Sequence, residues 1–253
     1  MTSRLSNYPL LTLLLTAALM WVGIQIGQLL GKRKPISEEE GKGFDLITSA
    51  TLTLLGLIIG FSFSMAVSRY DLRKAYEEEE ANAIGTEYVR AGLLSGESSA
   101  KVKTMLKEYL EQRLRWYTER DPDLLGQTDQ ETLKLQDQMW TVVQDAAVPN
   151  QTATMGLVLS GMNDVLNRQG YTQAAWWNRI PRGAWVLMVA LSFCSCVLVG
   201  YGARWKGPML AFVLPIIIAV AFFLIADIDS PRRGVIRVAP QNLISLRDSL
   251  RGQ

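Results

Sequence analysis

Acidic side chains form the densest group of residues in this sequence that could do chemistry. Two hypotheses fit the acidic run at positions 77–80: a solvated helix surface paired with nearby Arg and Lys, or carboxylates in a water-filled vestibule that concentrate cations. A second acidic pair follows the last apolar stretch and is either a structural clamp or an ion-facing site. The residues concerned are Glu77, Glu78, Glu79, Glu80 and Asn82, and then Asp227 and Asp229.

Other residues that support catalysis or metal binding are missing from the sequence. There is no histidine, which removes the commonest general base and the commonest zinc ligand. Cys194 and Cys196 stand two positions apart, so on a helix they point in divergent directions and cannot share a disulfide or a metal. No nucleophile motif accompanies the carboxylates. We therefore expect no enzymatic activity, no metal and no cofactor.

The elements that must position these acidic groups are apolar. Four stretches of 19 to 23 residues contain no Asp, Glu, Lys or Arg. A hydrocarbon core of ~30 Å takes ~20 apolar residues in helix to cross, so each stretch can span a membrane. This pattern excludes a soluble enzyme, a disordered chain and a secreted disulfide scaffold. The stretches are 8–30, 46–68, 183–203 and 208–226.

The four spans divide the chain into parts. Because the number of spans is even, both chain ends share one side of the membrane with the long segment between spans two and three. Lys and Arg near the helix ends are more numerous on that side, which places it in the cytosol. The counts are nine (Arg4, Arg69, Arg73, Lys74, Arg179, Arg182, Arg232, Arg233, Arg237) against six (Lys32, Arg33, Lys34, Lys42, Arg204, Lys206). The parts are transmembrane helices 1 and 2 (1–68), a cytosolic helical domain (69–182), transmembrane helices 3 and 4 (183–228) and a cytosolic C-terminal segment (229–253).

The segment 69–182 is predicted to be helical throughout, without β-alternation. Residues 69–94 are rich in good helix formers and continue the second span without a break. Residues 98–119 and 152–169 each carry an apolar stripe at helical spacing. Each of these helices must bury its apolar face on another helix or on another subunit, which predicts an all-α protein.

A break between two of these helices is predicted after position 119. Asp121-Pro122 and Gly126 interrupt the helical pattern. Thr128 and Glu131 have the spacing of a capping box, in which the hydroxyl and the carboxylate each satisfy a free backbone N–H. We therefore expect the next helix to begin at Thr128.

Small residues recur at intervals of four in the first two spans. Such rows let helix backbones approach closely in lipid. They indicate packing either within one subunit or around the axis of an oligomer, and the residues cannot decide between the two. The rows include Gly23 and Gly27 in the first span, and Gly56, Gly60 and Ser64 in the second.

A second row, of mostly apolar residues, lies beside the small row of the second span. Thr53, Leu57 and Phe61 recur at intervals of four, about 100° around the helix from the glycines. Such a row is ordinary contact with lipid or with the protein core. If it surrounds an axis, it forms a constriction that gates by dewetting.

Motifs in three parts of the chain resemble the bestrophin-like domain family of bacterial membrane proteins, most of whose members lack an assigned function. The resemblance covers nearly the whole chain, including the order of two spans, a helical domain and two spans. The motifs are Ile59-Gly60-Phe61 through Val67-Ser68-Arg69-Tyr70, then Glu79-Glu80-Ala81-Asn82-Ala83-Ile84-Gly85-Thr86, and Asp227-x-Asp229-Ser230-Pro231-x-x-Gly234.

The resemblance to bestrophin channels proper is more distant, and it implies a function. It implies a homo-oligomer, pentameric by analogy, in the bacterial inner membrane, whose partners are the lipid bilayer and inorganic ions, with no nucleic acid. The second helix would line the pore, and Thr53, Leu57 and Phe61 would form its neck. The acidic calcium clasp of the animal channels is missing after Gly234, so the resemblance implies no calcium gating.

Two functions from different classes follow. The first is an ion channel that favours cations weakly, because four consecutive glutamates place at least one on whichever face lines the pathway. The second is a non-conducting membrane scaffold or sensor whose cytosolic helices bind a partner.

Overall fold

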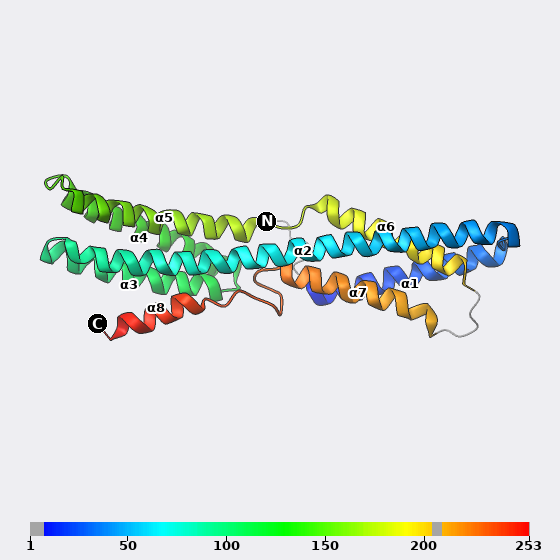
Figure 1. Ribbon diagram of the computed structural model, residues 1–253. Helices are drawn as coiled ribbons and strands as arrows, with labels where there is room; N and C mark the ends of the chain where they lie inside the picture. The colour runs from blue at the N-terminus through cyan, green and yellow to red at the C-terminus, as the bar shows by residue number, and fades with distance from the viewer. Residues whose placement is uncertain (1–7, 204–208, 253) are drawn as a thin grey trace. The chain divides into compact units, whose positions relative to one another are not determined.

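The computed structural model describes residues 8–203 and 209–252, and within these ranges it contains helices and no strand (Figure 1). Arg4, Arg204 and Lys206, which contributed to the predicted orientation, lie outside the described residues. The chain divides into two compact units. Unit 1 comprises Met1–Tyr70 and Arg179–Arg237, and unit 2 comprises Asp71–Asn178 and Val238–Gln253.

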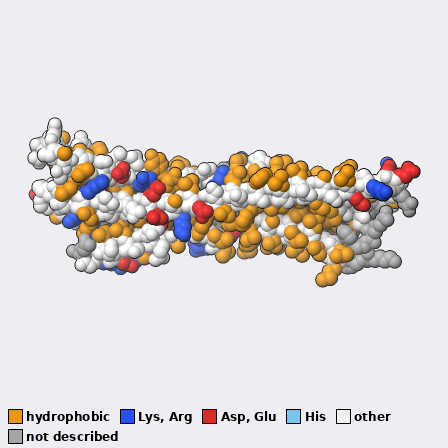
Figure 2. Space-filling view, viewed as in Figure 1, with side chains coloured by type: hydrophobic (Ala, Val, Ile, Leu, Met, Phe, Trp, Pro, Cys, Tyr) orange, Lys and Arg blue, Asp and Glu red, His pale blue; other side chains and the backbone are white. Residues whose placement is uncertain are grey.

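Unit 1 contains the apolar helices. Four helices of the described chain are long and apolar enough to cross a membrane, which confirms the four predicted spans. Hydrophobic side chains predominate on the visible surface of these helices, and charged side chains gather at its outer end (Figure 2). The helices are α1 (Pro9–Arg33), α6 (Arg182–Tyr201), α7 (Leu210–Asp229) and the first part of α2 (Glu38–Arg90).

Glycines set the contact between α1 and α6. A Cβ added to Gly27 would lie 2.1 Å from the carbonyl oxygen of Val197, and one added to Gly200 would lie 2.3 Å from that of Ile24. Any side chain at these positions would force the two backbones apart. The first row of small residues therefore packs within one subunit, and Gly23, against Cys196, belongs to the same contact.

Unit 2 is a bundle of amphipathic helices. Val102, Leu106 and Tyr109 of the predicted stripe are fully buried, as are Val158 and Met162. The apolar stripes predicted from the sequence thus form the core of this unit. Its helices are the second part of α2, η2 (Ala91–Leu93), α3 (Gly96–Thr118), α4 (Pro122–Ala147), α5 (Ala153–Trp177) and α8 (Gln241–Arg251).

The predicted start of the fourth helix is wrong. Helix α4 begins at Pro122, six residues before Thr128, and the Asp121 side chain accepts a hydrogen bond from the backbone N–H of Asp123 at 2.8 Å. Asp at the N-cap followed by Pro at the first helical position satisfies the helix start without the capping box. Thr128 lies inside α4, where its hydroxyl donates to the carbonyl of Leu124, and Gly126 does not interrupt the helix.

Two further features concern connections. Helix α2 runs unbroken from Glu38 to Arg90, as the helix-forming composition of residues 69–94 predicted. Residues 238–253, which the sequence suggested as part of a separate C-terminal segment, belong to unit 2 together with residues 71–178. The C-terminal helix α8 therefore completes a fold that begins far earlier in the chain.

Candidate functional site

In unit 1, helix α2 has one buried face and one exposed face. Leu55, Ser62 and Ala66 are buried, and Leu55 and Ala66 belong to the hydrophobic core. On the opposite side, Leu57 is 51% exposed and Phe61 is 61% exposed. A large apolar side chain left this open on a membrane helix must contact lipid or another protein copy.

The small residues of α2 lie on the same open side. A Cβ added to Gly56 or Gly60 would meet nothing within 4 Å, whereas those on Gly23 and Gly27 would meet α6. Thr53 and Ser64 are also exposed. The two rows on α2 thus form a single outward face that no other part of the described subunit covers.

In unit 2, the outward side of α2 carries polar side chains, with Val89 as an exposed apolar residue near its end. Asp71, Glu78 and Asn82 are exposed. Positions 71 and 78 are separated by seven residues, close to two helical turns, so Asp71 and Glu78 lie in one row on the same side of α2 within unit 2. Asp71 was missed by sequence analysis, although its position in this row could have identified it.

The inward side of α2 buries three of the acidic residues and one arginine. Arg73, Glu77 and Glu80 each have a relative exposure of 1%, and Glu87 has 0%. The expectation that Glu77 and Glu80 face a water-filled vestibule is therefore wrong for this structure. Because consecutive residues of a helix are about 100° apart, Glu77 and Glu80 point toward the core of unit 2 when Glu78 points outward.

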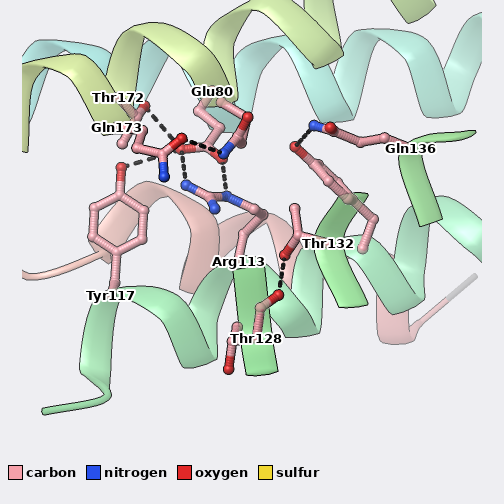
Figure 3. Close-up of polar contacts among 10 residues, drawn as sticks. Glu80, Arg113, Tyr117, Thr128, Thr132, Gln136, Thr172 and Gln173 are labelled. Carbon is pink, nitrogen blue, oxygen red and sulfur yellow. Dashed lines mark hydrogen bonds and ion pairs between the residues drawn. The ribbon is translucent and has the colours of Figure 1, made fainter. Parts of the chain in front are cut away.

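Glu80 lies in a buried polar network with α3 and α5 (Figure 3). Its carboxylate forms an ion pair with Arg113 and accepts hydrogen bonds from the hydroxyls of Tyr117, at 3.2 Å, and Thr172, at 3.1 Å. Burial lowers the pKa of the Arg113 guanidinium, but the charge and hydrogen bond of Glu80, together with Tyr109 and Tyr117, raise that pKa by more and leave it above its ordinary value. Burial, and then the Glu80 charge, raise the pKa of Tyr117, so its hydroxyl remains a donor.

Glu77 and Arg73 each hold the end of another helix. The Glu77 carboxylate accepts hydrogen bonds from the backbone N–H groups of Asn242 and Leu243, both at 2.9 Å, at the start of α8. The Arg73 guanidinium donates to the carbonyls of Ala175 and Asn178 at the end of α5. Each charge has the sign that the helix dipole and the free backbone groups at that terminus favour.

Glu79 lies at the edge of a cavity of about 300 Å³ in unit 2. It forms a half-exposed ion pair with Arg168 of α5. The cavity is lined by residues of α2 and α5: Glu79, Asn82, Ala83, Thr86, Arg90, Gly161, Asp164 and Arg168. Its walls carry two acidic and two basic side chains.

Asp227 and Asp229 hold the turn that follows α7. The Asp227 carboxylate accepts hydrogen bonds from the N–H groups of Val235, at 2.7 Å, and Ile236, at 2.8 Å. Asp229 accepts one from Ile180 at 3.1 Å. A Cβ added to Gly234 would lie 2.4 Å from the Asp227 carbonyl, which explains the glycine. Both aspartates are buried, so the clamp interpretation fits and the ion-facing one does not.

Among residues 8–203 and 209–252, no three His, Cys, Asp or Glu side chains are grouped so that they could hold a metal ion. Cys194 and Cys196 are both free thiols. Of the buried acidic residues of the described chain, Glu77, Glu80, Asp227 and Asp229 accept hydrogen bonds, whereas Glu87 has no hydrogen-bond partner.

Comparison with known proteins identifies the class. The family model of the Bestrophin-like domain matches residues 33–243, most of the chain, so the protein belongs to the Bestrophin-like domain family. No functionally curated protein matches the sequence.

Solved structures share the fold. A variant of a bacterial bestrophin homologue from Klebsiella pneumoniae superposes with a TM-score of 0.67 at 13% identity, covering 97% of this chain and 99% of that chain. Another structure of the Klebsiella pneumoniae homologue, phased with zinc, gives a TM-score of 0.64 at 14% identity, covering 94% and 98%. The protein is thus an all-helical membrane protein with a bestrophin-like fold.

Proposed function

We propose that this protein is a homo-oligomeric ion channel of the bacterial inner membrane, pentameric by analogy with bestrophins, whose pathway is lined by the outward face of α2. The observation that carries the proposal is that face itself. In unit 1 the exposed residues Thr53, Leu57 and Phe61, and in unit 2 the exposed residues Asp71 and Glu78, lie on the side of α2 opposite its buried residues. Copies arranged around an axis would enclose this row.

Within that arrangement, Leu57 and Phe61 form the neck. Their exposed apolar side chains would narrow the pathway, and the neighbouring Gly56 and Gly60 leave room for helices from adjacent copies to approach. Residues 69–182 and both termini lie on the cytosolic side, as the distribution of Lys and Arg near the spans favours.

The charge on the outward face favours cations. Asp71 and Glu78 are exposed there, and repetition in each subunit would turn each into a ring of carboxylates. Arg73 could have cancelled this charge, but its guanidinium is buried against the end of α5. Lys74 remains as an exposed base nearby. In a narrow vestibule the attraction between such rings and a cation exceeds its value in bulk water several-fold.

Two matched serines test whether α2 lines the pathway. In a background with Cys194 and Cys196 replaced by alanine, Ser64→Cys lies on the outward face and Ser62→Cys on the buried face. In planar bilayers, a charged thiol reagent should block most of the current through Ser64→Cys and leave the Ser62→Cys current unchanged. Equal sensitivity of the two variants would contradict the pore assignment. Correctly assembled protein that never conducts would favour the scaffold or sensor.

Reversal potentials in asymmetric sodium chloride test the cation preference. We expect a shift towards the sodium equilibrium potential, and we expect Asp71→Asn combined with Glu78→Gln to reduce it. Glu108→Gln serves as a control, because this exposed charge lies on α3 and not on the outward row of α2. A shift towards the chloride equilibrium potential in the parent protein would refute the cation assignment.

A further inference from the structure

Glu87, on the inward side of α2, is buried without a hydrogen-bond partner. Its relative exposure is 0%, and neither carboxylate oxygen has a partner. An ionised carboxylate here would lose its hydration without gaining a hydrogen bond. That loss costs far more free energy than burying a neutral carboxyl. The other buried glutamates of α2, Glu77 and Glu80, both accept several hydrogen bonds. Glu87 is thus the exception among them.

A glycine of α5 makes the burial of Glu87 possible. A Cβ added to Gly161 would lie 1.9 Å from Oε2 of Glu87 and 2.6 Å from Nη1 of Arg90. The carboxyl therefore rests directly on the backbone of α5. The close contact between α2 and α5 at this point requires a glycine on α5. It also requires a carboxyl on α2 that can be buried without hydration, which a neutral carboxyl tolerates better than an ionised one.

Few charged groups surround this carboxyl. On α2 the nearest is Arg90, whose guanidinium makes a long hydrogen bond of 3.5 Å to the carbonyl of Leu157. On α5 it is Asp164, which is exposed. Neighbouring η2 (Ala91–Leu93) has no charged residue, and Lys103 and Lys107 of α3 lie over the Tyr88 ring.

Burial and these charged groups determine the pKa of Glu87. Burial raises its pKa to about 8, with Arg90 lowering it and Asp164 raising it by smaller amounts. The carboxyl is therefore mostly neutral at pH 7 and ionised at pH 9. Gly161, Arg90 and Asp164 also line the cavity of about 300 Å³, which gives water access to this part of the α2–α5 contact.

We propose that Glu87 is a proton-dependent latch between α2 and α5: the neutral carboxyl permits the close contact at Gly161, and loss of its proton draws it toward Arg90 and the cavity and loosens that contact. The proposal concerns unit 2 alone and holds whether or not the protein conducts ions. It makes the stability of one helix contact depend on pH between about 4.5 and 8.

The direction of the pH dependence follows from the two protonation states. The buried arrangement binds the proton more tightly than an exposed glutamate does, because the pKa is about 8 rather than 4.5. Its stability relative to an opened arrangement therefore falls as pH rises from 4.5 to 8 and changes little above 8. Between pH 7 and pH 9 the opening equilibrium should increase by about tenfold.

Two measurements on the full-length protein in detergent test the latch. Infrared difference spectra between the parent protein and Glu87→Gln should contain the C=O band of a protonated carboxyl, which disappears with a midpoint near pH 8. Hydrogen exchange of α5 peptides around Gly161, taken relative to Glu87→Gln at the same pH, should become about tenfold faster between pH 7 and pH 9. Absence of the band at pH 6, or a constant exchange ratio, would overturn the proposal.

A pair of glycine variants supplies the control. Gly161→Ala should displace the Glu87 carboxyl and give rapid exchange of α5 already at pH 7. Gly156→Ala, on the same helix with nothing within 4 Å of the added Cβ, should keep the exchange rate and its pH dependence. The same behaviour in both variants would contradict the latch, because only one of them touches Glu87.

Discussion

Replacing Arg113 by methionine removes the cation that Glu80 faces inside unit 2. Both side chains are essentially without solvent exposure, and the guanidinium also lies 4.5 Å from the centre of the Trp116 ring. Methionine keeps much of the apolar stem that packs there, so the main loss is the charge. The variant leaves the Glu80 carboxylate with only the hydroxyls of Tyr117 and Thr172 as partners.

The expected loss is large because the stranded charge stays buried. Removing one partner of a buried ion pair costs about 3–5 kcal/mol of folding free energy. For a unit of this size, each kcal/mol lowers the melting temperature by roughly 3 °C, so Arg113→Met should melt about 10 °C lower. Adding Glu80→Gln should restore about 2 kcal/mol or more, since the amide oxygen still accepts from both hydroxyls and no charge is stranded.

Thermal melts of the full-length protein in detergent, followed by tryptophan fluorescence, measure these changes. Trp116 and Trp176 lie beside the network, with ring centres 4.7 Å apart, and should report its loss. Arg115→Met, at an exposed position of the same helix, is the control and should change the free energy of unfolding by less than about 0.5 kcal/mol. If the effects of Arg113→Met and Glu80→Gln simply add, the two side chains are not coupled and the reasoning fails.

Three further predictions concern unit 1. Gly27→Leu should lower the melting temperature, because the backbone of α6 occupies the space of the new side chain, whereas Gly60→Leu should leave it unchanged and alter the oligomer seen by native mass spectrometry. Leu57→Ala and Phe61→Ala should widen the neck and raise the single-channel conductance in bilayers, and correctly assembled variants as silent as the parent would argue against a neck. Asp227→Ala should free the turn after α7 and speed its cleavage by proteases; an unchanged cleavage rate would show that the clamp is dispensable.

The apolar spans and the amphipathic helices could be predicted from the sequence. A span is a continuous apolar run, and the buried face of an amphipathic helix recurs in the sequence at the helical period. Charge-free stretches of about 20 residues indicated α1, α6 and α7, and the stripe through Val102 and Leu106 indicated α3. The start of α4 could not be resolved, since Asp121 and Thr128 both resemble helix caps and only the contacts of the folded chain decide between them.

The acidic run shows the limit of such inference at the candidate site. Four consecutive glutamates must point to every side of a helix, but the sequence does not reveal which side is buried. The partners that bury Glu77 and Glu80 come from α8 and α3, at separations of 165 and 33 residues. No local pattern links them. Asp71 could have been placed, because it repeats the position of Ser64 one heptad later.

The contact between Glu77 and the start of α8 has a consequence for synthesis of the protein. Residues 71–178 leave the ribosome before α6 and α7. The N–H groups that donate hydrogen bonds to Glu77 belong to residues made after both of those helices. Until then the carboxylate lacks its partners, and unit 2 cannot reach its final packing. Completion of unit 2 therefore requires residues 242 and 243, and a chain truncated before residue 238 should expose this incomplete surface to cellular proteases.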